Sequence, residues 1–426
     1  MNFHLKTYGC KLNQADSELI RGLLLKNHKE ASREEADFII LNTCGVVEKT
    51  ERKILKEATD LKKKGKKIII SGCLPLISFE ECNKIADGII GPTNISSINL
   101  IVEKVLKGEK ALDIKKKKID KSDLCLEKKR EERKTCSAII SIAEGCLGSC
   151  SYCATRFARK ELNSFSVENI VKEAKTVLAS GFKEIQLTSQ DLSVYGIEKG
   201  KQMLPELLKE LVKIEGDFRI KLGMMNPGHA LKMIDRLLKA YESDKIYKFI
   251  HIPLQSGDDE LLKKMNRGYS ASDFITVAQV FKKKFKDGII ATDIIIGHPL
   301  ETEESFEKTI KVIKKIKPDV IHIFKFSKRK GTPDFNLKDY PDRIKKERSR
   351  ILTELFKNLN LEKNKKYLNK KFNVLIIEKR KDKYLARTES GRAVVLGKGE
   401  IGTFVKVKIV DYRWNYLIAS NIDNYY

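Results

Sequence analysis

The sequence predicts an α/β protein with an N-terminal α/β domain built on a parallel sheet, a central partial (β/α) barrel and a small C-terminal antiparallel β-barrel. Three observations support this prediction. Apolar strand patterns alternate with amphipathic helical patterns over residues 1–108, the alternation resumes over 136–364, and short strand patterns separated by turns fill 365–426. A chain of 426 residues is long enough for two or three domains with sizeable cores.

The N-terminal domain is predicted from strands that alternate with helices. The expected strands are 3–10, 36–44 and 66–73, and the expected helices are 14–28 and 47–65. Each strand ends at a cysteine, namely Cys10, Cys44 and Cys73. Because the carboxyl ends of parallel strands lie along one edge, where ligands bind, we expect these cysteines to form one site. The alternative is that each is a small buried hydrophobic residue.

Residues 109–135 carry many charges and almost no apolar periodicity, which predicts a solvated linker. Its lysines are also candidates for contacts with a phosphate backbone, since such contacts need no specific geometry. The net charge of +26 favours an anionic partner, most simply a nucleic acid. The alternative is that a lysine-rich surface reflects a hot environment or an AT-rich genome.

Six strand patterns alternate with helical patterns after the linker, and a trailing helical pattern follows from about 341 to 368. The expected strands are 137–146, 183–191, 219–224, 248–257, 288–299 and 319–327. Six βα units predict a full or partial parallel barrel, whose active site lies at the carboxyl ends of its strands. A loop with Cys146, Cys150 and Cys153 follows the first of these strands and therefore lies on that face.

The last part of the chain contains short apolar runs separated by turn residues, which predicts a small antiparallel barrel. The expected strand runs are 371–378, 383–389, 392–397 and 404–420. Basic residues on this barrel suit a nucleic acid: Arg387, Arg392, Lys406, Lys408 and Arg413. The alternative is a solvated basic surface on a capping or dimerising barrel.

The N-terminus lacks the basic start and apolar run of a signal peptide, and no apolar stretch is long enough to span a membrane. We therefore expect a soluble, cytoplasmic protein without a membrane partner. Nine cysteines in a reducing compartment favour metal ligation or catalysis over disulfides. Cys82, Cys125 and Cys136 match no ligand pattern and are interpreted as structural.

The stretch EGCLGSCSYC, residues 144–153, places three cysteines close together and leaves a metal without a fourth protein ligand. Structural zinc would need Cys125 or Cys136 to complete its set. An iron-sulfur cluster on three cysteines instead leaves one iron open, and that iron can bind a small molecule through its amine and carboxylate. The sequence therefore leaves two metal chemistries, of which iron-sulfur suits the open position better.

The spacing C-x3-C-x2-C, with Tyr152 before the last cysteine and a strand before the first, resembles the radical S-adenosylmethionine superfamily. The resemblance implies that Cys146, Cys150 and Cys153 bind a four-iron cluster whose open iron chelates S-adenosylmethionine.

The segments TYGCKLNQADSE, LNTCGVVEKTE and SGCLP, together with the cysteine loop and the C-terminal barrel, are similar to the methylthiotransferases over essentially the whole chain. This resemblance implies an N-terminal cluster domain, a radical barrel and a C-terminal RNA-binding barrel called TRAM. It also implies that Cys10, Cys44 and Cys73 hold a second four-iron cluster, which carries the sulfur that is transferred.

The segments YCATRFARK, LTSQDLSVYG, LGMMNPGH and HIPLQSGDDELLKKMNRGY are similar to the archaeal and eukaryotic branch. That branch attaches methylthio at C2 of N6-threonylcarbamoyladenosine at position 37 of tRNA. The alternatives within the family act on isopentenyladenosine in tRNA or on an aspartate of a ribosomal protein, and usually have Ile-Pro or Val-Pro where Ala154 and Thr155 stand here. The chain also departs from the family at Lys160, His298 and Leu300.

The resemblance implies that one S-adenosylmethionine methylates the sulfur and a second is cleaved reductively to a radical that starts substitution at C2. Two clusters must then face one base. The implied partners are the anticodon loop of tRNA and an electron donor such as ferredoxin or flavodoxin; the sulfur donor stays open. An alternative of a different class is a zinc-stabilised nucleic-acid-binding protein without catalysis.

Polar residues at strand ends are the candidates for the cofactor and the substrate. The cofactor candidates are Ser189, Gln190, Asp191, Gln255, Ser256 and Asp293, with helix caps or a buried polar network as the alternative. The candidates for phosphate or for the threonyl carboxylate are Arg159, Arg267 and Lys325, with Arg387 and Arg413 on the last barrel. His251 and His322 alternate with apolar neighbours and are interpreted as core histidines.

Overall fold

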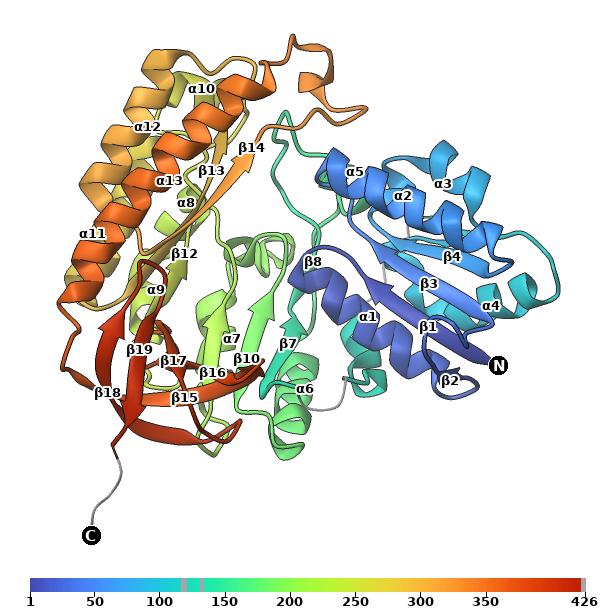
Figure 1. Ribbon diagram of the computed structural model, residues 1–426, viewed down its shortest axis with the longest axis horizontal. Coiled ribbons are helices and arrows are strands. Elements are labelled where there is room, and N and C mark those ends of the chain that lie inside the picture. Colours follow the sequence, from blue (N-terminus) through green and yellow to red (C-terminus); the bar gives the residue numbers. More distant parts are fainter. Residues whose placement is uncertain (116–120, 131–133, 423–426) are drawn as a thin grey trace.

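The computed structural model describes residues 1–115, 121–130 and 134–422, which fold into three parts (Figure 1). The N-terminal part is a parallel sheet in the order β2-β1-β3-β4-β5-β6. Its strands are β1 (Asn2–Thr7), β2 (Lys29–Glu30), β3 (Phe38–Thr43), β4 (Lys67–Gly72), β5 (Gly88–Ile90) and β6 (Ala111–Asp113). Its helices are α1 (Lys11–Leu24), α2 (Glu48–Lys63), α3 (Phe79–Ile85) and α4 (Ile98–Leu106).

The central strands of this sheet carry continuous apolar runs, which suits a sheet with helices on both faces. Every residue of β3 is buried, as the sequence Phe-Ile-Ile-Leu requires for a strand without a solvent face. One core lies between the sheet and the pair α1 and α4, and a second lies on the opposite face under α2. The expected α/β arrangement is therefore confirmed.

The segment expected as a solvated linker departs from that expectation. Its first residues form β6, which extends the sheet beside β5, and a 3₁₀ segment (Lys121–Glu127) follows. Lys121 and Lys128 are buried because each meets carboxylates from distant elements; Nζ of Lys128 lies 2.8 Å from Oε1 of Glu173. The charge composition of a sequence does not reveal such partners. Because Lys121 and Lys128 are packed against them, the described part of 109–135 is more than a solvated linker.

The central part contains six parallel strands in two three-stranded sheets: β7 (Ser137–Ser141), β10 (Glu184–Thr188), β11 (Arg219–Leu222), β12 (Phe249–His251), β13 (Ile289–Ile296) and β14 (Val320–Lys325). Parallel bridges from Ile220 to Ile246 and from Met224 to His251 join the two sheets. No pairing among the described residues joins β7 to β14, so the barrel is partial, as expected. A short hairpin of β8 (Ala143–Glu144) and β9 (Asn163–Ser164) flanks the cysteine loop.

Helices cover the outside of the partial barrel and enclose the largest core of the protein. They are α6 (Val167–Ala179), α7 (Leu204–Val212), α8 (Pro227–Leu231), α9 (Ile234–Ala240), α10 (Asp259–Lys264), α11 (Ala271–Lys284), α12 (Glu303–Ile316) and α13 (Asp342–Lys365), whereas the short α5 (Thr155–Ala158) follows the cysteine loop and lies against the N-terminal part. Within the described ranges, no helix has the length and apolar character needed to cross a membrane.

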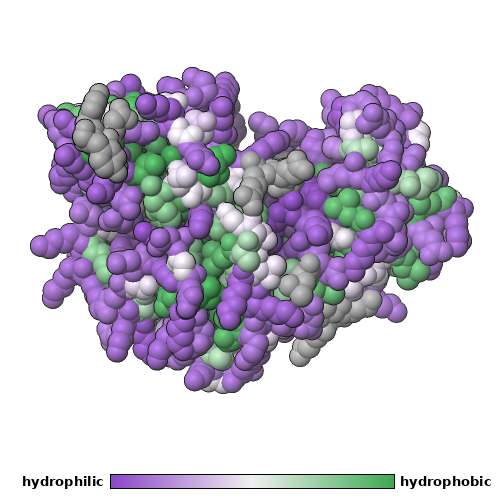
Figure 2. Space-filling model, turned by 90° about the horizontal axis from the view of Figure 1, so that it is seen from below, coloured by the Kyte–Doolittle hydropathy of each residue, from purple (hydrophilic) through white to green (hydrophobic). Residues whose placement is uncertain are grey.

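The C-terminal part is a closed barrel in the order β15-β16-β17-β19-β18. Its strands are β15 (Lys371–Arg380), β16 (Lys383–Thr388), β17 (Ala393–Leu396), β18 (Phe404–Tyr412) and β19 (Leu417–Asn421). The expected run 404–420 forms two strands joined by a turn, and β17 pairs with β19 in parallel, which closes an otherwise antiparallel barrel. The face seen from below is largely hydrophilic (Figure 2).

This small barrel packs against the amino ends of the central strands, opposite the cysteine loop. Nε of Arg387 lies 3.0 Å from Oε2 of Glu184, the first residue of β10, and Nη2 of Arg392 lies 2.9 Å from Oδ1 of Asp319, just before β14. The partial barrel is therefore covered at one end by the C-terminal barrel and bears the cysteine loop at the other (Figure 1).

Candidate active site

The three N-terminal cysteines converge at the carboxyl edge of the first sheet. Cys10 is the N-cap of α1, Cys44 follows β3, and Cys73 follows β4. The Sγ atoms of Cys10 and Cys73 each lie 4.0 Å from Oδ1 of Asn13. Gly9, at φ +110°, passes so close to Cys44 that a Cβ there would meet Sγ of Cys44 at 3.2 Å. Three thiols thus surround Asn13 and Gly9.

Arg159 reaches this group from the other side of the domain boundary. Its Nε donates to Sγ of Cys73 at 3.3 Å, and its Nη2 donates to Oδ1 of Asn13 at 3.2 Å. The side chain of Asn13 is fixed in turn, because its Nδ2 donates to the carbonyls of Tyr8 and Thr43, both at 2.9 Å. A guanidinium beside a thiol favours the thiolate form, which is the form that binds metal.

Arg159 also belongs to a buried cluster of two cations and two carboxylates. It forms ion pairs with Asp16 of α1 and with Glu144 of β8, and Nζ of Lys121 lies 2.8 Å from a carboxylate oxygen of each. Burial opposes these charges, but the paired carboxylates raise the pKa of Arg159. The donors of Arg159 meet Asp16, Glu144, Asn13 and Cys73, so its expected role toward a substrate anion stays a prediction that these contacts do not favour.

The second cysteine group folds around Gly148. The amide of Gly148 donates to Sγ of Cys146 at 3.2 Å, and a Cβ built on Gly148 would lie 3.3 Å from that sulfur and 3.6 Å from Sγ of Cys150. The amide of Cys153 donates to the carbonyl of Cys150 at 3.1 Å, which closes the loop. Burial raises the pKa of Cys146 to about 11, and likewise that of Cys44, so metal binding at both groups must release protons.

Arg267 makes two contacts that hold the cysteine loop. Nη1 of Arg267 lies 2.9 Å from Sγ of Cys150 and 3.1 Å from the hydroxyl of Tyr152. Arg267 is part-buried, and its side chain contacts Cys150, Tyr152 and Tyr269, so its role toward a substrate anion stays a prediction.

Asp334 anchors the loop on its other side. Oγ of Ser151 donates to Oδ2 of Asp334 at 2.6 Å, and Nε2 of His298 lies 2.9 Å from the same oxygen. His298, a departure from the family pattern, is fully buried and therefore supports the residue that positions the cysteine loop.

The candidates at the end of β10 lie beside the loop. Oε1 of Gln190 accepts from the amide of Gly145, next to Cys146, at 2.8 Å. Asp191 accepts from Ser193 and from the amide of Asn226, and Nδ1 of His229 lies 3.2 Å from it. Oγ of Ser189 is buried without a hydrogen-bond partner among the described residues. A free hydroxyl at this position suits a polar ligand.

The two candidates that follow β12, Gln255 and Ser256, have different surroundings. Gln255 adopts φ +62°, and its Oε1 is buried without a partner among the described residues, as at a strained ligand-facing position. Ser256 is fully buried and bonds to the amide of Asp258, with Thr309 at 3.5 Å, so it does not face the site as expected.

Asp293 joins two histidines instead of standing alone. Its Oδ1 lies 2.9 Å from Nε2 of His251 and 2.8 Å from Nδ1 of His322. Burial opposes the charge, but the two histidines hold the pKa of Asp293 well below its usual value. The histidines are hydrogen-bonded as expected, yet they are not core residues, because both line a cavity and His322 is exposed.

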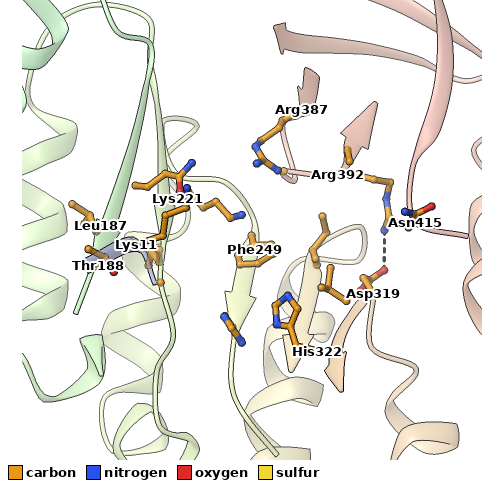
Figure 3. A pocket seen from close by; sticks show the side chains of 18 residues that line it. Lys11, Leu187, Thr188, Lys221, Phe249, Asp319, His322, Arg387, Arg392 and Asn415 are labelled. Carbon is orange, nitrogen blue, oxygen red and sulfur yellow. Dashed lines mark hydrogen bonds and ion pairs between the residues drawn. The ribbon is translucent and has the colours of Figure 1, made fainter. Parts of the chain in front are cut away.

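That cavity, of about 270 Å³, lies between the strands of the partial barrel and the C-terminal barrel (Figure 3). Inward-facing residues of β10 to β14 line it together with Lys11 of α1 and Arg387 and Arg392 of the C-terminal part. Lys221 of β11 is among them and was not singled out from the sequence; only its inward position in the alternation Arg-Ile-Lys-Leu marks it. Lys325 and Arg413 are exposed and do not line the cavity.

Comparison with known proteins places the chain in a family. Residues 140–313 match the model of the radical SAM superfamily, and residues 2–91 match uncharacterized protein family UPF0004. A probable threonylcarbamoyladenosine tRNA methylthiotransferase of Archaeoglobus fulgidus is 48% identical over 99% of this chain and 98% of its own length. This chain belongs to the threonylcarbamoyladenosine tRNA methylthiotransferase family.

More distant relatives match this chain over most of its length or share its fold. The threonylcarbamoyladenosine tRNA methylthiotransferase of Drosophila melanogaster is 33% identical over 99% of this chain and 77% of its own. A tRNA-2-methylthio-N(6)-dimethylallyladenosine synthase of Aquifex aeolicus is 32% identical over 96% of both chains. The radical S-adenosylmethionine methyltransferase TsrM of Kitasatospora setae superimposes with a TM-score of 0.57 at 14% identity, covering 78% of this chain and 75% of its own, which shows a shared fold.

Both cysteine groups fit the cofactors of this family, which are two four-iron clusters and S-adenosylmethionine. Each group offers three thiols and no fourth cysteine, and each has a guanidinium donating to a sulfur, Arg159 at Cys73 and Arg267 at Cys150. Such donors to sulfur are a usual means of tuning iron-sulfur clusters. A closed structural zinc site would need a fourth ligand that neither group supplies among the described residues.

Proposed function

We propose that this chain inserts a methylthio group at C2 of N6-threonylcarbamoyladenosine at position 37 of tRNA. The observation that carries the proposal is the position of Arg159. Its guanidinium contacts Cys73 of one cysteine group and pairs with Glu144, two residues before Cys146 of the other. Two cysteine groups linked through one buried arginine suit an enzyme in which the two bound clusters must act on one base.

In this proposal Cys10, Cys44 and Cys73 hold one four-iron cluster, and Cys146, Cys150 and Cys153 hold the other. When bound, the clusters and S-adenosylmethionine supply the sulfur, the methyl group, the electron and the radical that the reaction requires. Ser189, Gln190 and Gln255 then provide polar atoms for the methionine part of the cofactor, since they end strands beside the cysteine loop.

The chain's own residues position the reacting groups. Gln190, Arg267 and Asp334 fix the backbone and sulfur atoms of the cysteine loop through the hydrogen bonds described above. The cavity inside the partial barrel receives the substituent of the modified base, and its apolar wall, which includes Phe249, excludes water from that substituent. Arg413 and Lys325 remain exposed to contact the phosphates of the anticodon arm.

The remaining assignments follow from this function. An iron-sulfur enzyme that cleaves S-adenosylmethionine consumes electrons, so a ferredoxin or a flavodoxin is the proposed donor. The proposed location is the cytoplasm, where tRNA is modified. The domain limits proposed from sequence, 1–108, 136–364 and 365–426, assign one cluster to each of the first two parts and RNA binding to the third.

The test is nucleoside analysis of tRNA from a host that lacks its own methylthiotransferases and expresses this chain. The expected product is 2-methylthio-N6-threonylcarbamoyladenosine. It should be absent with a Cys10→Ala variant and with a Cys150→Ala variant, and present with Cys82→Ala, which is buried outside both groups. Methylthiolated isopentenyladenosine instead would assign the chain to the other tRNA branch, and no methylthiolated nucleoside from a folded, iron-loaded protein would refute the proposal.

A further inference from the structure

The cavity inside the partial barrel contains a lysine that forms no ion pair with any described residue. Lys221 points inward from β11, and its Nζ lies 4.5 Å from the centre of the Phe249 ring. No ion pair involves Lys221 within the described part of the chain. Glu184 attracts its charge from a distance, but Arg387 and Lys11 lie close enough to repel it. Burial, reinforced by Arg387, lowers the pKa of Lys221 to about 7.

The carboxylates near this cavity are already occupied. Oε1 of Glu184 accepts from the hydroxyl of Ser137 and from Gln186, both at 2.7 Å, and its Oε2 faces Nε of Arg387 at 3.0 Å. Glu184 is thereby committed to one cation and two neutral donors.

Asp319, the other buried carboxylate of the cavity wall, is surrounded by three cations. Its Oδ1 lies 2.7 Å from Lys363 and 2.9 Å from Arg392, and its Oδ2 lies 3.3 Å from Lys282. Figure 3 shows Asp319 with Arg392 on one side of the cavity and Lys11 and Lys221 on the other, with Arg387 above them. An enclosed ammonium without an anion is costly, so the second side has the charge of a receptor for an anionic ligand.

The size and place of the cavity indicate what kind of anion enters it. A volume of about 270 Å³ lies at the low end of small-molecule sites and suits one substituent, not a length of polynucleotide backbone. Lys221 lies two residues before Gly223 on the path of β11, so it is about 7 Å deeper than the rim that faces the cysteine loop. A group extending from a base at the rim would reach it.

We propose that Lys221, with Arg387 and Lys11 beside it, binds the carboxylate of the threonylcarbamoyl group and so selects the substrate base. This inference rests on the proposed function, because the carboxylate belongs to the proposed substrate. The apolar wall formed by Phe249, Ile289 and Val320 packs against the rest of the substituent. An adenine with an uncharged isopentenyl group would leave the Lys221 ammonium without its anion, and the site therefore discriminates against it.

The test measures binding of the reconstituted full-length protein to two anticodon stem-loop RNAs that differ only at position 37, one with N6-threonylcarbamoyladenosine and one with adenosine. Wild-type protein should prefer the modified RNA. Lys221→Met should reduce this preference roughly ten- to hundredfold while binding of the unmodified RNA stays constant. Lys213→Met, at an exposed lysine just before β11, is the matched control and should keep the preference.

The outcomes separate the inference from the function on which it rests. If wild-type protein shows no preference, the proposed substrate is wrong. If wild-type protein prefers the modified RNA and Lys221→Met does so equally, Lys221 does not bind the carboxylate. If Lys221→Met weakens both RNAs to the same degree, the anion at Lys221 is a backbone phosphate, which also overturns the inference. The variant should fold, since methionine places an uncharged chain against Phe249; its iron content and melting temperature verify this.

Discussion

Nε of Arg159 lies 3.3 Å from Sγ of Cys73, although 86 positions separate the two residues in the chain. Arg159 closely follows the second cysteine group, whereas Cys73 belongs to the first. The contact is therefore made across the boundary between the N-terminal sheet and the partial barrel. Asp16 and Glu144 pair with the same guanidinium from both sides of that boundary, so domain packing and the environment of the first cluster depend on one side chain.

Arg159→Gln should therefore reduce both stability and cluster retention. Among the described residues, the substitution leaves Lys121 as the one cation paired with the buried Asp16 and Glu144, and breaking such a pair costs roughly 3–5 kcal/mol. We expect a lower unfolding midpoint in denaturant and loss of iron from the first cysteine group. Lys160→Gln, at the exposed neighbouring position, should match wild type. Equal iron content and midpoint in Arg159→Gln and wild type would contradict this role.

Arg267→Gln should lower the reduction potential of the second cluster. Arg267 places a positive charge 2.9 Å from Sγ of Cys150, and a cation beside a cluster favours the reduced form, which carries one more negative charge. Its loss should lower the potential by on the order of 50 mV, which corresponds to about a tenfold change for one electron.

The potential of Arg267→Gln is best measured in a Cys10→Ala, Cys44→Ala, Cys73→Ala background, where one cluster titrates. Arg267→Lys keeps the charge and should restore most of the potential. A potential that is the same in Arg267→Gln as in the parent would mean that the guanidinium only packs against Tyr152 and Tyr269.

The cysteine groups could be predicted from sequence because strand periodicity places residues at strand ends without knowledge of the rest of the fold. Cys10, Cys44 and Cys73 each follow a parallel strand, and parallel strands end at one edge. The roles of Arg159 and Arg267 could not be predicted in this way. Their sulfur partners are 86 and 117 positions away, and an arginine after a helix has the same sequence pattern whether it meets solvent, a thiol or a carboxylate.

Burial of charge explains the other differences from the sequence prediction. Lys121 and Lys128 lie in a stretch whose composition favours a solvated linker, yet both are buried against Asp16, Glu144 and Glu173. Lys221 lies in the short strand β11, where alternate residues face the interior of the partial barrel. Patterns of hydrophobicity lead one to expect apolar residues at interior positions, so they do not predict a lysine there. A charged residue at such a position was the one signal in the sequence for this binding site.

Iron content should reveal two independent clusters. We expect about eight irons in the reconstituted protein and about four after Cys146→Ala, Cys150→Ala, Cys153→Ala substitution. The matching variant at Cys10, Cys44 and Cys73 should also retain about four. Cys82→Ala removes a buried thiol from the core under α2 and should retain about eight. Colorimetric iron and sulfide analysis tests this, and about four irons in the parent with none in the first variant would exclude a cluster at the N-terminal cysteines.

Preference for the threonylcarbamoyl RNA should weaken as pH rises above about 7. In the free protein, burial beside Arg387 lowers the pKa of Lys221 to about 7, and a bound carboxylate raises it by favouring the ammonium. Binding is therefore strongest below pH 7 and is lost progressively as pH rises through the pKa of the bound state, while the ligand carboxylate stays ionised throughout. The preference is the ratio of the affinities for the modified and unmodified RNAs, and both affinities are measured from pH 6 to 9.

Lys221→Arg should make this ratio independent of pH over the same range, because arginine stays protonated. A wild-type ratio that is constant or rises with pH would rule out the Lys221 ammonium as the group that binds the carboxylate.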